Sequence, residues 1–228
     1  MIDVTYIDHM GSDLSVVNAA RVSFGKKSGW ANFKSGDAHR GVLHDKDRKL
    51  IHYLAEHKHI SPFGHCFASF HIKAPIFVAR QLVKHKFLRW NEISRRYVDS
   101  EPEFYEPDVW RGRNKDKKQG SDGVVDTEGM EHEEKMIAAL YADALSIYKS
   151  LTYSEYGINV CPEQARMILP QSMMTEWYWS GSLDALADMC NLRCTSDTQL
   201  ETRLVANQIC DSMKKLFPVS WFALRLEK

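Results

Sequence analysis

Residues 61–97, SPFGHCFASFHIKAPIFVARQLVKHKFLRWNEISRRY, contain the change of pattern that decides the fold. Proline and glycine within 61–64 break both helical and strand periodicity and predict a loop. Alternation from Phe67 to Lys73 predicts a strand. Pro75 suits the first turn of a helix, where its missing N–H costs nothing, so we expect a helix from there to about Leu88. A polar segment from Asn91 to Tyr97, irregular or extended, follows.

The remainder of the chain predicts more helix than strand. We expect further strands at 2–7 and 171–179, and helices at 12–23, from 45 onward, and at 133–153, 162–169, 182–192 and 197–216. Residues 111–136 are rich in charge and glycine, which predicts a mobile surface insertion. The sum is one α+β domain covering residues 1–228.

The composition disfavours general nucleic-acid binding. The 228 residues include 30 basic and 30 acidic side chains, so there is none of the basic excess that such binding proteins usually show. The hydrophobic share of 44% is sufficient for a globular core. The N-terminus lacks the basic start and apolar run of a secretory signal, and no apolar run is long enough to span a bilayer. We expect a soluble protein with no membrane partner, in the cytoplasm, or in the host cytoplasm if the chain is viral.

The cysteines and histidines do not predict a metal site. Five scattered cysteines favour reduced core thiols, at positions Cys66, Cys161, Cys190, Cys194 and Cys210. Cys161 precedes a proline and could act as a thiol nucleophile, although a small apolar residue before a helix is the commoner situation. The spacing of His59, His65 and His71 matches no known ligand pattern, and we interpret His59 as a pocket wall.

Gln81-Leu82-Val83-Lys84-His85-Lys86 is the sharpest local signal. On a helix, Gln81, Lys84, His85 and Leu88 would share one face. Cations on a helix with so apolar a body favour an anionic ligand such as a phosphate, although a solvated basic face is the alternative.

Arg166 and Arg193 each stand among apolar neighbours. The guanidinium fork suits a phosphate or a pyrimidine carbonyl. Internal ion pairs with Glu163 or Glu201 are the alternative.

The block 61–97 resembles the flavin-dependent thymidylate synthases. Their signature of Arg-His-Arg, seven residues and Ser appears here as Lys84-His85-Lys86, seven residues and Ser94. The resemblance extends over 13–24, 165–170 and 191–193, which is nearly the whole chain except 111–136. It implies that family's α+β fold, with helices packed on a mainly antiparallel sheet, and a homotetramer with active sites shared between subunits.

The resemblance also implies a set of site residues. Around dUMP it places Gln81, Lys84, Glu92, Ser94, Arg95 and Arg96 from one subunit, with Arg166 and Arg193 from another. Around FAD it places His59, Ser61, Lys84, His85, Lys86, Glu92, Ser182 and Asp188. Arg193 would be the catalytic residue, stabilising negative charge on the uracil ring, and Ser94 a substrate-binding hydroxyl.

The implied reaction is methylation of dUMP to dTMP. Methylene-tetrahydrofolate supplies the carbon, FAD the hydride and NADPH the reducing power, so the protein orients and polarises. Hydroxymethylation of the same pyrimidine and a catalytically silent nucleotide-binding homologue are the alternatives. The sequence departs from the family pattern at Lys84, Lys86, Ser182, Asp184, Asp188 and Asp197. Lysine lacks the bidentate fork of arginine, and an acid beside a diphosphate is unfavourable, so the departures bear mainly on the flavin contacts.

Overall fold

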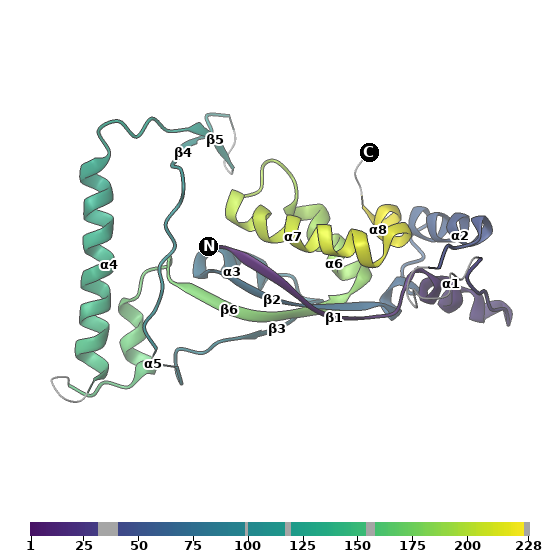
Figure 1. The fold of residues 1–228 in the computed structure, drawn as a ribbon, viewed down its shortest axis with the longest axis horizontal. Helices are drawn as coiled ribbons and strands as arrows, with labels where there is room; N and C mark the ends of the chain where they lie inside the picture. Colours follow the sequence, from purple (N-terminus) through teal and green to yellow (C-terminus); the bar gives the residue numbers. More distant parts are fainter. Residues whose placement is uncertain (32–40, 99, 117–119, 154–157, 226–228) are drawn as a thin grey trace.

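A four-stranded antiparallel sheet in the order β1-β2-β6-β3 forms the centre of the protein (Figure 1). The computed structural model describes residues 1–31, 41–98, 100–116, 120–153 and 158–225. The strands are β1 (Asp3–Met10), β2 (Phe67–Pro75), β6 (Met174–Ser182) and β3 (Arg89–Glu92). The strand predicted at 67–73 is confirmed, whereas the one predicted at 171–179 begins at Met174.

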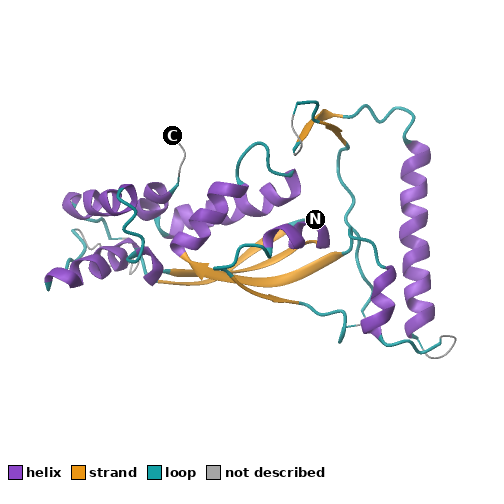
Figure 2. Ribbon diagram, turned by 180° about the vertical axis from the view of Figure 1, so that it is seen from behind, coloured by secondary structure: helices purple, strands orange, loops and turns teal. Residues whose placement is uncertain are grey.

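The two central strands alternate between a buried and an open face. Phe70 pairs with Trp179 and Ile72 with Trp177, and all four side chains are buried. Such cross-strand aromatic and β-branched pairs stabilise a sheet. The residues between them along the strands point to the opposite face and are mostly polar. Lys73 and Glu176, for example, form an ion pair on that face. Helices of the described residues cover the apolar face, as Figure 1 shows and Figure 2 shows from the other side of the molecule.

The described part of the chain contains eight α-helices, most of them over one face of this sheet (Figure 1). They are α1 (Asp13–Arg21), α2 (Asp45–Glu56), α3 (Ile76–Leu82), α4 (Glu131–Thr152), α5 (Pro162–Ala165), α6 (Leu183–Arg193), α7 (Leu200–Leu216) and α8 (Pro218–Leu224). The helix predicted at 162–169 is thus short and continues as the 3₁₀ turn Arg166–Ile168, and α7 begins at Leu200 rather than at Asp197. None of these helices combines the length and apolar character that crossing a bilayer requires.

Helix α8 was not predicted, and a distant carboxylate caps it. Buried Asp13 accepts hydrogen bonds from the backbone N–H groups of Val219 at 3.0 Å and Ser220 at 2.8 Å. These donors at the start of a helix have no intrahelical partner, so the carboxylate satisfies them. The capping residue lies at the other end of the sequence, where local patterns give no sign of it.

The helix predicted from Pro75 to about Leu88 is wrong at its C-terminus. α3 ends at Leu82, and 83–88 form a turn. The reason is tertiary, since β3 begins at Arg89 opposite Ser180 of β6, and the chain must reverse before it enters the sheet. A helix continued to Leu88 would leave no residues for that reversal.

The described residues of the predicted insertion at 111–136 contain regular secondary structure. They form a two-stranded hairpin, β4 (Arg111–Arg113) with β5 (Ser121–Val124), and the first residues of α4, whereas 117–119 lie outside the described residues. α4 stands to one side of the sheet and packs on α5 and the 3₁₀ turn that follows it (Figure 1). Gly120, just before β5, adjoins the loop before α7: its φ is +83°, and a Cβ there would lie 3.1 Å from the carbonyl oxygen of Asp197.

Candidate active site

Lys84, His85 and Lys86 lie in the turn between α3 and β3, not on a shared helix face with Gln81 as the sequence predicted. The N–H of His85 donates to the carbonyl of Leu82 at 3.1 Å and closes the end of α3. Both lysines are exposed, and neither has an ion-pair partner among the described residues. Two cations are therefore available to an anionic ligand.

His85 contacts Arg193, which lies at the end of α6. Arg193 Nε donates to His85 Nε2 at 3.1 Å, and the imidazole packs edge-on against Trp179 with the centroids 6.1 Å apart. Burial, followed by the positive charge of Arg193, lowers the pKa of His85 to about 4. The ring is therefore neutral at physiological pH, with its proton on Nδ1, and acts as an acceptor that holds the guanidinium.

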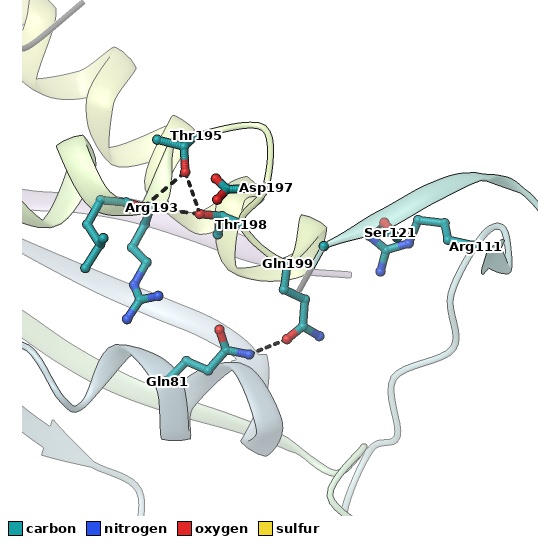
Figure 3. Close-up of a pocket in the computed structure, with 10 residues that line it drawn as sticks. Gln81, Arg111, Ser121, Arg193, Thr195, Asp197, Thr198 and Gln199 are labelled. Carbon is teal, nitrogen blue, oxygen red and sulfur yellow. Dashed lines mark hydrogen bonds between the residues drawn. The ribbon is translucent and has the colours of Figure 1, made fainter. Parts of the chain in front are cut away.

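The Gln81–Arg193 hollow is a cavity of about 610 Å³ that these two residues line together with residues of the β4–β5 hairpin and the loop before α7. The guanidinium of Arg193 points toward α3, which carries Gln81 (Figure 3). Behind it, Thr195 and Thr198 both donate to the carbonyl of Leu192, at 3.3 and 3.2 Å, and order the loop that follows α6. The hollow therefore presents an amide and a guanidinium to a polar ligand.

The Glu92–Arg166 hollow is a second cavity, of about 580 Å³, and includes Ser94 and Arg95 in its lining. The carboxylate of Glu92 is held at both oxygens, by Thr175 Oγ1 at 2.7 Å and by Trp90 Nε1 at 3.1 Å. A fixed carboxylate and three arginines, Arg80, Arg95 and Arg166, line one cavity, which suits a ligand that carries both hydrogen-bond donors and a phosphate.

The alternative ion pairs expected for Arg166 and Arg193 do not form. Glu163 pairs instead with Arg96 at 3.5 Å, and Arg166 Nε donates to the backbone carbonyl of Glu163 at 3.2 Å rather than to its carboxylate. Glu201 pairs with Arg111. Both isolated arginines thus line cavities without a carboxylate partner among the described residues, which favours the ligand-binding interpretation.

The cavities divide the predicted nucleotide residues differently from the expected division between subunits. Arg193 shares a hollow with Gln81 of the same chain, and Arg166 shares one with Glu92, Ser94 and Arg95. Arg96 and Lys84, from the same predicted set, line neither of these two cavities. Each cavity is therefore lined by only part of the predicted nucleotide set.

Comparison with known proteins decides the family. The family model described as thymidylate synthase complementing protein matches residues 5–219. A flavin-dependent thymidylate synthase of Thermus thermophilus is 37% identical over 221 residues, which cover 96% of this chain and 74% of that protein. One of Kosmotoga olearia is 38% identical over 224 residues, covering 96% and 88%. The chain belongs to the flavin-dependent thymidylate synthase family.

A solved structure of similar fold agrees with this assignment. The UMP/dUMP methylase PolB from Streptomyces cacaoi, bound with 5-Br UMP, superposes with a TM-score of 0.79 at 30% identity, covering 98% of this chain and 93% of that one. The predicted α+β fold, with helices on an antiparallel sheet, is therefore confirmed.

Three of the residues that the flavin-dependent thymidylate synthase resemblance assigns to FAD, Ser61, Ser182 and Asp188, lie on or near α6. Ser182 is the N-cap residue of α6, Asp188 lies further along it, and Ser61 precedes the 3₁₀ turn η2 (Phe63–His65), which packs against α6. His59 is exposed, with its ring parallel to that of His57. Burial, and then the charge of Asp184, raises the pKa of Asp188.

One buried atom tests whether this region fits FAD. Asp184 Oδ1 is buried without a hydrogen-bond partner in the described residues. A carboxylate oxygen in that position needs a donor, which a hydroxyl or an adenine amino group supplies and a phosphate does not. The residues fit FAD in this sense: the unpartnered Asp184 oxygen would accept from a hydroxyl or amino group of FAD. The exposed Lys84 and Lys86 are the cations that would hold the diphosphate of FAD.

Sequence reasoning missed the residues that complete the Gln81–Arg193 hollow. Arg111 and Ser121 belong to a segment interpreted as an insertion, and Gln199 was not singled out. An available signal was Gln199-Leu200-Glu201, two polar residues flanking the first apolar position of a predicted helix.

The cysteines provide no obvious nucleophile. All five are free, and Cys66, Cys190 and Cys210 are buried. Burial raises the pKa of Cys66 to about 11, which keeps the thiol protonated. Cys161 is exposed at the N-cap of α5, so the prediction of a core thiol is wrong there. In the described residues no group of three or more histidine, cysteine or acidic side chains is arranged to hold a metal ion.

Proposed function

We propose that this protein methylates dUMP to dTMP, with methylene-tetrahydrofolate as carbon donor, FAD as hydride carrier and NADPH as reductant. The observation that carries the proposal is the Arg193–His85 pair in a hollow shared with Gln81. Family membership makes the reaction the expected one, and this pair adds a site in which His85 orients the Arg193 guanidinium. Arg193 has no carboxylate partner among the described residues, so its charge is available to the nucleotide.

Arg193 activates the pyrimidine in this proposal. A guanidinium beside the uracil carbonyls stabilises the negative charge that develops when the ring becomes a carbon nucleophile. His85 contributes by accepting the Nε hydrogen of Arg193, which leaves the two terminal nitrogens to face the ligand. Bound FAD supplies the hydride chemistry, for which no side chain of this protein substitutes.

Phosphate binding falls to the Glu92–Arg166 hollow. Arg95 and Arg166 supply charge and the Ser94 hydroxyl supplies a donor, while Glu92 is fixed by Thr175 and Trp90. We further propose that sites are completed between subunits of a homotetramer, and that the enzyme works in the cytoplasm.

The test is mass spectrometry of the nucleotide after the purified protein is incubated with FAD, NADPH, methylene-tetrahydrofolate and dUMP. Conversion to dTMP is expected. A hydroxymethyl product would replace the proposal with the hydroxymethylation alternative, and unchanged dUMP would favour a silent homologue. UMP is assayed in parallel because the structural neighbour PolB is a UMP/dUMP methylase.

Arg193→Ala is the variant that tests the role of Arg193 in this reaction. Loss of the charge-stabilising donor is expected to lower kcat by at least about 10²-fold while the protein stays folded. Single-turnover oxidation of reduced flavin by methylene-tetrahydrofolate and dUMP measures the chemical step. Turnover at the wild-type rate would contradict the role assigned to Arg193.

A further inference from the structure

A buried carboxylate lies behind the Gln81–Arg193 hollow. Glu201, in the first turn of α7, is only 3% exposed. Arg111 Nη2 donates to its Oε1 at 2.5 Å, and Tyr105 Oη donates to the same oxygen at 3.3 Å. Burial, and then the Glu201 carboxylate, raises the pKa of Tyr105 to about 12, so this phenol remains a donor.

Two glutamines continue from this carboxylate to the wall of the hollow. Gln199 Nε2 donates to Glu201 Oε2 at 3.1 Å, and Gln81 Nε2 donates to Gln199 Oε1 (Figure 3). Thr202 Oγ1 donates to Gln81 Oε1 at 3.2 Å. We call the set Arg111, Glu201, Gln199 and Gln81 the amide relay.

The carboxylate sets the direction of every hydrogen bond in the relay. An ionised carboxylate only accepts, so Gln199 must turn its NH₂ toward Glu201 and its carbonyl toward Gln81. Gln81 must then turn its NH₂ toward Gln199, and its carbonyl toward Thr202. Without the charge, either amide could reverse at little cost, because a primary amide offers a donor and an acceptor of similar shape.

Arg111 is what makes a buried charge tolerable at Glu201. A buried carboxylate is stable only when it is paired and hydrogen-bonded. Arg111 is anchored by the β4–β5 hairpin, where its Nη1 also donates to Ser121 Oγ at 3.4 Å. The segment that the sequence predicted to be an insertion thus supplies the counter-charge for a residue behind the nucleotide site.

We propose that Arg111 and Glu201 are positioning residues that fix the orientation of the Gln81 amide and thereby set the affinity for the pyrimidine nucleotide. The inference rests on the proposed function, in which Gln81 contacts dUMP. It extends that function by adding a hairpin residue that lines the same hollow and a buried carboxylate behind it, both of which act on the ligand through Gln81 in this role.

The experiment measures dUMP and FAD dissociation constants by calorimetry for the full-length wild type, Arg111→Met, Arg111→Lys and Glu201→Gln. Arg111→Met and Glu201→Gln are expected to weaken dUMP binding about tenfold, the scale of one charge-assisted hydrogen bond, with FAD affinity unchanged. Arg111→Lys keeps the charge and is expected to recover most of the affinity. Arg113→Met, an exposed change on the same hairpin, is the control and should bind dUMP as wild type does.

A mutant cycle separates positioning from general destabilisation. If the relay acts through Gln81, Arg111→Met has no further effect on dUMP binding in a Gln81→Leu background, whereas a purely structural effect would add. Because Arg111 is partly exposed, this arm remains informative even if Glu201→Gln fails to fold.

The outcomes distinguish the relay from the proposed function. Wild-type protein that binds dUMP, with Arg111→Met and Glu201→Gln binding equally well, would overturn the relay and leave the proposed function intact. Additive effects in the Gln81→Leu background would also overturn it. Wild-type protein that does not bind dUMP would remove the proposed function, and the relay's role with it.

Discussion

At the scale of single residues, the neutral state of His85 has a measurable consequence. Its pKa is about 4 in the folded protein, against the ordinary value of 6.5. Between these values the unfolded chain binds a proton that the folded protein does not, so stability is full above about pH 6.5 and falls as the pH drops toward 4. We expect urea unfolding to show this decline in the wild type and a flatter profile in His85→Phe, which keeps an aromatic ring against Trp179.

Parallel profiles for the two proteins would contradict the assignment of His85 as a buried neutral acceptor. His132→Phe, at an exposed position on α4, gives the baseline for removing a histidine. The acceptor role also predicts that dUMP binding weakens as His85 becomes protonated, since an imidazolium has no lone pair for Arg193.

Sequence reasoning identified these residues but not their contacts. Lys84-His85-Lys86 and the two isolated arginines stood out from their neighbours in the sequence, and both arginines do line cavities. The bond between His85 and Arg193 joins positions 108 apart and depends on where α3 ends. No local periodicity encodes that distance, so the histidine was assigned to the flavin alone.

At the scale of elements, the turn 83–88 depends on a close approach to the sheet. A Cβ at Gly181 of β6 would lie 2.1 Å from Leu88 Cδ2, and Leu88 is buried. We expect Gly181→Ala to push Leu88 and the turn that carries His85 away from β6, at a cost of about 1–3 kcal/mol in the free energy of unfolding. Urea unfolding measures the loss, and dUMP binding should weaken with it.

The matched control is Gly29→Ala, because a Cβ at Gly29 meets no atom within 4 Å. We expect this change to leave the free energy of unfolding unaltered or to raise it by up to about 1 kcal/mol, because alanine lowers the conformational entropy of the unfolded chain. Adding Leu88→Ala to Gly181→Ala should relieve part of the clash, giving a cost smaller than the sum of the single changes. Strict additivity would show that Leu88 is not the contact that matters.

The elements that sequence patterns predicted best are those fixed by their own periodicity. β2 was found because alternation from Phe67 to Lys73 matches a half-buried strand. α3 was extended too far because its propensity continues past Leu82, where pairing of β3 with β6 overrides it. α8 was missed because the cap that begins it, Asp13, is remote in sequence.

At the scale of the whole molecule, the two hollows raise the question of how a complete nucleotide site is assembled. Within one chain, Gln81 lies with Arg193, and Ser94 lies with Arg166. If sites are shared as the family resemblance implies, Ser94 of one chain acts with Arg193 of another. If each site belongs to one chain, both residues must act within it.

Subunit mixing decides between these arrangements. Arg193→Ala and Ser94→Ala are each expected to be inactive or severely impaired alone. When they are unfolded together and refolded at equal ratio, a site shared between two symmetry-related chains gives mixed pairs in which one site carries both defects and the other carries neither. Random pairing makes half of the pairs mixed, so about one quarter of wild-type activity should return. No recovery, with mixed oligomers confirmed by native mass spectrometry, would place the complete site within a single chain and assign both hollows to one nucleotide-binding surface.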